Sequence, residues 1–176
     1  MQSPSTPRSV GVESHAGKYL TFQLGPEVYG LEILKVREII GLMDITPVPR
    51  TPSHIRGVIN LRGKIIPVID LRVKFSMERT ADTERTCIIV VDLEQEVGTI
   101  QMGVLVDAVS EVLNFKPEQI EPAPSFGDGV RTNYIRGLAK AAGRVGILLN
   151  IEEVLAKAEL IDIAGHTRVG AAQSAA

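Results

Sequence analysis

The chain carries an internal repeat, and this repeat restricts its possible folds more than any other feature of the sequence. Ile55 to Leu71 aligns without a gap on Ile135 to Ile151, and of these 17 positions 4 are identical and 7 more are close in type. A second block, Tyr29 to Ile40, aligns on Met102 to Leu113. Repetition of this kind predicts two copies of one small structural unit.

The two copies are expected to pack against each other. Each has about 60–70 residues, and a unit of that size buries too little apolar surface to be comfortably stable alone. We therefore expect two small units around a pseudo-two-fold axis with a shared core. The groove between them is the natural place for a ligand or a protein partner.

Short apolar runs separated by turn residues predict an all-β fold with a few short helices. The runs are rich in Val, Ile and Leu and are divided by Gly, Pro and Asp. The expected strands are Tyr19–Leu24, Val28–Ile33, Gly57–Leu61, Ile65–Leu71, Cys87–Leu93, Thr99–Val106, Ile135–Ala139 and Val145–Asn150. Helix is expected in one or two turns at Leu34–Ile39, after Val73, and as a C-terminal helix over Ile151–Leu160, which Asn150 can cap.

The same patterns set the expected domain boundaries. Residues 1–17 and 165–176 are small and polar, or rich in Ser, Pro and Gly, and are predicted to be disordered tails. Residues 18–164 are predicted to form one domain, in which the two intertwined units occupy about 18–85 and 86–160.

The charge balance and the absence of targeting signals exclude several classes of partner. The 19 Lys and Arg against 21 Asp and Glu give a net charge of −2, which provides no attraction toward nucleic acid or an anionic membrane. No apolar run approaches the ~18 residues of a membrane span, and the N-terminus lacks the order of a signal peptide. With one cysteine, the sequence favours a protein of the reducing cytoplasm that does not insert into a membrane.

Signatures of catalysis and of metal or cofactor binding are missing. The segment from Gly57 to Ile65 has the wrong spacing for a phosphate loop and an Ile where Ser or Thr would hold magnesium. The three histidines are scattered, and Cys87 opens an apolar strand, where a small buried role is typical. We therefore predict a protein that is no enzyme and has no cofactor and no metal.

Three polar or exposed features remain as candidate contact sites. Arg62 lies at an expected hairpin tip, which a solvated turn would explain equally well. Phe126 ends a loop stiffened by Pro122 and Pro124, and it could contact a partner or fold back on the core. Val36 and Glu38 lie in the expected helical turn, where spacing alone favours a core role for Val36.

The order and spacing of several short segments resemble one known family over about Lys18 to Leu160. The segments are Tyr29–Ile39, Thr51–Pro52, Ile55–Gly63, Ile66–Arg72, Val106–Asp107, Val109–Leu113, Ile135–Leu138 and Leu148–Ile151. Together they resemble CheW, the coupling protein of bacterial chemotaxis. The resemblance implies two five-stranded SH3-like barrels and a scaffold without catalytic activity.

The resemblance also implies partners and sites. Members of this family bridge the cytoplasmic tip of methyl-accepting chemoreceptors and the regulatory domain of the histidine kinase CheA, in arrays attached to the membrane. By position, the receptor-binding residues would be Val36, Glu38, Gly57, Arg62 and Val112. Glu121 and Phe126 match a loop that would contact the kinase or form adaptor rings by self-association.

Other functions are weighed against this adaptor. One is a coupling protein of a non-flagellar sensory array that controls pili or gene expression, which has the same fold. Another is a small barrel that binds single-stranded oligonucleotides, but only seven aromatic residues and an acidic balance count against it. A hydrolase that uses pairs of Asp or Glu lacks the expected nucleophile and metal signatures.

Overall fold

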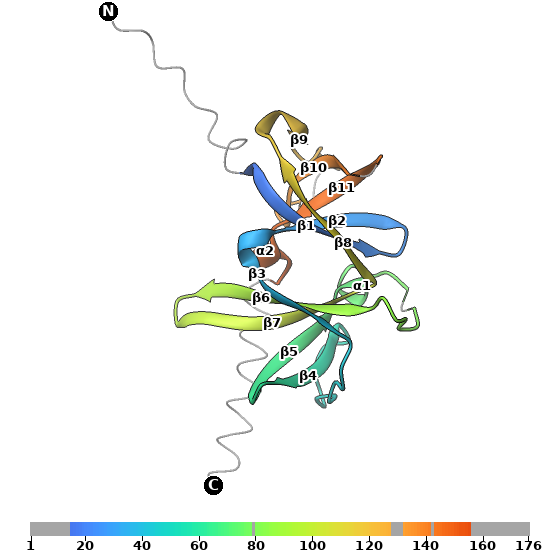
Figure 1. Ribbon diagram of the computed structural model, residues 1–176, viewed down its shortest axis with the longest axis vertical. Coiled ribbons are helices and arrows are strands. Elements are labelled where there is room, and N and C mark those ends of the chain that lie inside the picture. The colour runs from blue at the N-terminus through green and yellow to red at the C-terminus, as the bar shows by residue number, and fades with distance from the viewer. Residues whose placement is uncertain (1–14, 79, 128–131, 142, 156–176) are drawn as a thin grey trace, which may run out of the picture.

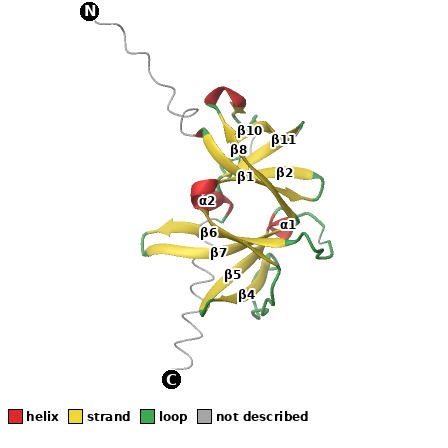
Figure 2. Ribbon diagram, in the orientation of Figure 1, coloured by secondary structure: helices red, strands yellow, loops and turns green. Residues whose placement is uncertain are grey.

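The computed structural model describes residues 15–78, 80–127, 132–141 and 143–155. Strands dominate it, and helix is limited to single turns (Figure 2). The strands are β1 (Gly17–Leu24), β2 (Glu27–Glu32), β3 (Val36–Gly41), β4 (Ile55–Leu61), β5 (Lys64–Asp70), β6 (Cys87–Gln95), β7 (Gly98–Val106), β8 (Ala108–Phe115), β9 (Ile120–Glu121), β10 (Ile135–Ala141) and β11 (Arg144–Leu149). The helical turns are η2 (Ile33–Lys35), α1 (Leu71–Lys74), η3 (Pro117–Gln119) and α2 (Ile151–Val154).

The strands form two sheets that lie one above the other in Figure 1. The first sheet has the order β8-β1-β2-β11-β10-β9, and the second has the order β3-β6-β7-β5-β4. The expected all-β class with two small barrels is confirmed. The two-residue strand β9 is the sixth strand of the first sheet, and its counterpart in the second sheet is the isolated bridge between Thr46 and Val58.

The sheets do not follow the predicted division of the chain at 85 and 86. The first sheet combines β1 and β2 with β8 to β11, whereas the second consists of β3 to β7. Each sheet therefore combines the first two strands of one repeat with the later strands of the other. The reason is that β3 and β8 both leave the hairpin that precedes them and join the opposite sheet, so the two repeats exchange strands reciprocally.

The repeat extends to the register of the strands. The parallel pair of β11 and β2 places Leu148 opposite Gly30, and the parallel pair of β5 and β7 places Val68 opposite Gly103. Space is limited at both glycines, because a Cβ at Gly30 would lie 2.8 Å from the Leu148 side chain and one at Gly103 would lie 3.2 Å from the Val68 side chain. Residues that are equivalent in the sequence repeat therefore occupy equivalent positions in the two sheets.

Apolar side chains form three buried clusters. One lies inside the first sheet around Tyr19 and Leu148, and another lies inside the second around Ile59 and Val90. The largest lies between the sheets and contains side chains of both, among them Phe22. This arrangement confirms the expected shared core and explains why neither unit needs to be stable alone.

Several expected boundaries were wrong. The segment predicted as helical turns at Leu34–Ile39 is the 3-10 turn η2 followed by strand β3, because the β-branched residues from Val36 onward pair with β6. Strand β8 was not predicted, and β1 already begins at Gly17, within the expected tail. The expected C-terminal helix begins at Ile151 as predicted, with the Asn150 side chain accepting a hydrogen bond from the Glu153 amide, and its part from residue 156 lies outside the described residues.

Candidate protein-docking surfaces

The predicted hairpin of Arg62 forms an exposed ion pair with strand β3. Arg62 and Gly63 connect β4 to β5 with φ values of 52° and 86°, as a tight hairpin turn requires. The Arg62 side chain is 71% exposed, and its guanidinium donates to the Glu38 carboxylate. The structure therefore brings two of the predicted receptor-binding residues together, across the open side between β3 and the β4–β5 hairpin.

Val36 lies on the edge strand β3 and Val112 on the edge strand β8. Each is on the face of its strand that points toward the opposite sheet. Val36 pairs with Val91 on β6, and Val112 pairs with Leu20 on β1, and both partners belong to the core between the sheets. Val36 is half-buried against this core, while Val112 on β8 is 48% exposed. Val36 thus contributes to the core, as its spacing suggested, and it also borders the surface.

The sequence analysis missed Ile39, which is the repeat equivalent of Val112. Ile39 pairs with Ile89 of the shared core and is 45% exposed on β3. Equivalent apolar side chains are therefore exposed on the edge strand of each sheet. The alignment of Tyr29–Ile40 with Met102–Leu113 could have indicated this pair.

Gly57 has a role within the fold. It has a φ of 146° at a bulge between β4 and β5, and a Cβ at this position would lie 2.7 Å from the carbonyl carbon of Thr46. The backbone that approaches Gly57 closely is therefore that of the same chain. Gly137 is its repeat equivalent, at the corresponding bulge of β10 and β11, where a Cβ would lie 3.0 Å from the carbonyl oxygen of Glu121.

The loop after β9 presents an exposed aromatic ring. Phe126 is 61% exposed, so its side chain does not fold back on the core. Glu121 ends β9 and pairs with Leu138 on β10, at the far edge of the first sheet from β8. Phe126 and the pair of Glu38 and Arg62 therefore belong to different sheets.

A cleft lined by aromatic rings was not predicted in detail. It has a volume of about 510 Å³ and lies beside α1 and α2. Tyr29, Phe75 and Tyr134 form a row along it, with ring centroids 5.7 Å and 6.0 Å apart. These residues come from three distant parts of the sequence, so no local pattern indicates that they meet.

Other groups that could carry chemistry are few. Among the described residues, no group of three or more His, Cys, Asp or Glu side chains is arranged to hold a metal ion. Burial raises the pKa of the Cys87 thiol, against the opposing effect of a backbone hydrogen bond at Val109. No helix within the described part of the chain is long and apolar enough to span a bilayer. His166 lies outside the described residues.

Comparison with known proteins identifies the family. The family model of the CheW-like domain matches residues 18–159. A chemotaxis protein CheW of Klebsiella aerogenes is 42% identical over 160 residues, which cover 91% of this chain and 94% of the relative. Protein FrzA of Myxococcus xanthus is 30% identical over 140 residues, which cover 78% of this chain and 84% of that protein.

A solved structure agrees with these relatives. The crystal structure of the scaffolding protein TtCheW from Thermoanaerobacter tengcongensis matches with a TM-score of 0.69 and 37% sequence identity, covering 80% of this chain and 92% of that one. The family model, the relatives and this structure together show that the chain belongs to the CheW family of chemotaxis scaffold proteins.

Proposed function

We propose that this scaffold couples chemoreceptors to the histidine kinase CheA, so that the state of the receptors controls autophosphorylation of the kinase. The chain would act in the cytoplasm, recruited to membrane-associated receptor arrays, and would contribute no catalysis of its own. Val36, Glu38 and Arg62 on the second sheet would bind the receptor tip, together with Val112 on the edge strand β8 of the first sheet. The loop of Glu121 and Phe126 would bind the regulatory domain of the kinase or a second copy of the chain in a ring.

The observation that carries this proposal is the separation of the two surfaces. An exposed ion pair lies on the second sheet, and an exposed aromatic ring lies on a loop of the first. An adaptor has to hold two partners at once, and the ion pair and the aromatic ring, which come from different sheets, offer a separate contact for each. Aromatic and arginine side chains are the residue types that most often dominate such contacts.

Binding is tested with purified components. We expect the chain to co-sediment with receptor-containing membranes and, separately, to be retained by immobilised CheA. Each partner should bind in the presence of a saturating amount of the other. Failure to bind either partner at low salt would refute the proposal.

Replacing Arg62 with alanine is expected to weaken receptor binding without unfolding the chain. The side chain is exposed, and an exposed ion pair contributes at most about 1 kcal/mol to stability. Receptor co-sedimentation and thermal unfolding should be measured together, with Lys64→Ala as the matched control, because Lys64 carries the same charge on the same hairpin. A melting temperature reduced as strongly as in a core variant would instead assign Arg62 a structural role.

Replacing Phe126 with alanine is expected to weaken kinase binding by at least tenfold and leave receptor binding unchanged. A central aromatic contact typically contributes about 2 kcal/mol or more to an interface, whereas an exposed ring contributes little to the fold. Affinity for immobilised CheA gives the measurement. The exposed Val97 at the tip of the β6–β7 hairpin is the matched control, since Val97→Ala removes an apolar side chain elsewhere. Equal effects of the two substitutions would contradict the assignment.

A further inference from the structure

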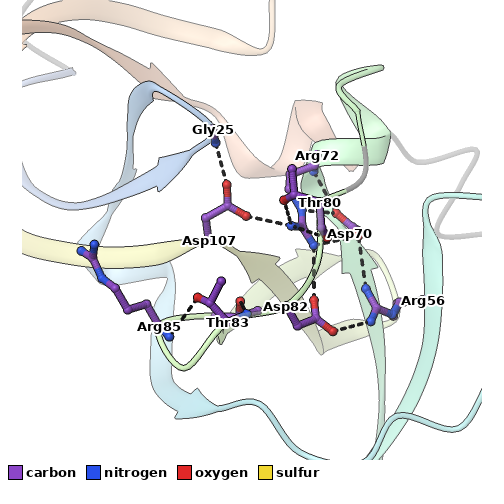
Figure 3. Close-up of polar contacts among 10 residues, drawn as sticks. Gly25, Arg56, Asp70, Arg72, Thr80, Asp82, Thr83, Arg85 and Asp107 are labelled. Atoms are coloured by element: carbon purple, nitrogen blue, oxygen red, sulfur yellow. Dashed lines mark hydrogen bonds and ion pairs between the residues drawn. The ribbon is translucent and has the colours of Figure 1, made fainter.

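An arginine is almost completely buried close to where the two sheets meet. The side chain of Arg72, on α1 at the end of the second sheet, is 2% exposed, and Figure 3 shows it surrounded by oxygen atoms. None of the surfaces described above uses it. A buried charge is retained only where partners compensate for its lost hydration, so its contacts need an explanation.

Three carboxylates and a threonine surround the Arg72 guanidinium. The closest carboxylate contact joins Nη1 of Arg72 to Oδ1 of Asp107, at 2.9 Å. Asp70 lies 3.3 Å from Nε and Asp82 lies 3.5 Å from Nη2, while Nη1 also donates to the hydroxyl of Thr80 at 2.6 Å. Burial by itself lowers the pKa of Arg72, but the hydrogen bond to Asp70 and the three nearby carboxylates raise it, so the group stays charged.

Asp107 connects this network to the other sheet. It is the one residue between β7 of the second sheet and β8 of the first. Its second carboxylate oxygen accepts a hydrogen bond of 2.6 Å from the amide of Gly25, in the turn between β1 and β2, and its own amide donates to the carbonyl of Gln23. Figure 3 shows the Asp107 carboxylate between Gly25 and Arg72. A single side chain thus joins the end of one sheet to a turn of the other.

The repeat provides an internal comparison, because the chain crosses between the sheets twice. At the other crossing, which comes first along the chain, β2 leads through η2 into β3, and the repeat equivalent of Arg72 is Glu152 on α2. Glu152 forms an ion pair with Lys35 at 2.7 Å, but these side chains are 42% and 30% exposed. One crossing is therefore closed around a fully buried arginine, and the other by the more exposed pair of Lys35 and Glu152, beside which Arg136 pairs with Glu32 within the first sheet.

We propose that Arg72 and Asp107 form a clamp that fixes the orientation of the two sheets relative to each other. Through it, Arg72 is a positioning residue for the pair of Glu38 and Arg62 on the second sheet relative to Phe126 on a loop of the first. This consequence for signalling rests on the proposed adaptor function, whereas the clamp itself does not. An adaptor with a loosened clamp would still bind each partner but would no longer hold them at the angle that coupling requires.

The clamp is tested on the isolated protein by measuring the distance between the sheets. Spin labels at Lys140→Cys on the first sheet and Lys64→Cys on the second, in a Cys87→Ser background, report this distance by pulsed electron resonance. Asp107→Asn keeps the size of the side chain and removes its charge, and it should clearly broaden the distance distribution. Arg72→Lys, which loses the planar fork, should do the same. Glu152→Gln at the other crossing is the matched control and should leave the distribution narrow.

Unchanged distributions in both clamp variants would overturn the proposal, provided circular dichroism shows them folded. A second test does not depend on whether the variants fold. It measures the hydrogen exchange rate of the Gly25 amide in the unmodified chain. Protection as strong as that of core amides supports the clamp, and exchange as fast as in an open turn overturns it.

The consequence for signalling is tested with the Asp107→Asn chain. It should bind receptors and CheA separately within about twofold of the unmodified chain, while kinase activation in the presence of all three components falls at least fivefold. Full activation despite a broadened distance distribution would refute the positioning role. If the unmodified chain bound neither partner, the adaptor proposal would fail, and the distance measurement would still decide on the clamp.

Discussion

Replacing Arg72 with alanine is expected to lower the free energy of unfolding by about 3–5 kcal/mol, the typical cost of removing one partner from a buried ion pair. The substitution leaves the carboxylate of Asp70, which is 1% exposed, with Arg56 at 3.4 Å as its remaining cation, and it leaves a cavity beside α1. Urea denaturation followed by circular dichroism measures the change.

The matched control for Arg72 is Lys35→Ala at the equivalent crossing. The pair of Lys35 and Glu152 is partly solvated, so its loss should cost no more than about 1 kcal/mol. A loss of less than 1 kcal/mol in Arg72→Ala as well would show that the buried network is not needed for stability.

Replacing Gly57 with alanine is expected to destabilise the fold by about 2–4 kcal/mol, from backbone strain and overpacking together. Its φ of 146° is rarely adopted by residues with a side chain, and the new Cβ would meet the backbone of Thr46, which has no flexible end to move away. Chemical denaturation gives the loss directly.

The variant Gly63→Ala separates the effect of backbone strain from the effect of overpacking. Gly63 also has a positive φ, of 86°, but a Cβ there would have no heavy atom within 4 Å, so only strain of about 1 kcal/mol is expected. A stable Gly57→Ala chain that had lost receptor binding would contradict this account and assign Gly57 to direct contact with the receptor.

The repeat allowed much of the fold to be predicted, because equivalent sequences adopt equivalent backbones. It gave the two units, the shared core and Asn150 as the cap of the C-terminal helix. The sequence alignment shows which segments are alike but not which copies pair, and for this reason the exchange of strands was missed. In the structure Asp107 alone separates β7 from β8, and a tight hairpin needs two loop residues, so β8 joins the other sheet; this reasoning was not open to the sequence analysis because β8 itself was not predicted.

The candidate sites also include residues whose environment the sequence indicated and residues whose environment it did not. Arg62 was predictable as exposed because hairpin tips lie at surfaces, whereas the sequence left open whether Phe126 faces solvent or the core, and only the structure shows it exposed. The burial of Arg72 was not predictable, because its partners Asp82 and Asp107 follow it by 10 and 35 residues and meet it only after both sheets have formed. In the repeat, Glu152 stands at the equivalent position with the opposite charge, and this difference was the available hint.

The central claim is that this chain couples receptors to the kinase, and autophosphorylation of CheA tests it most directly. Purified CheA should be incubated with receptor-containing membranes, with and without this protein, and its phosphorylation rate measured. We expect strong activation only when all three components are present, and inhibition of that activity when an attractant is added. Kinase activity that is the same with and without the protein would contradict the claim.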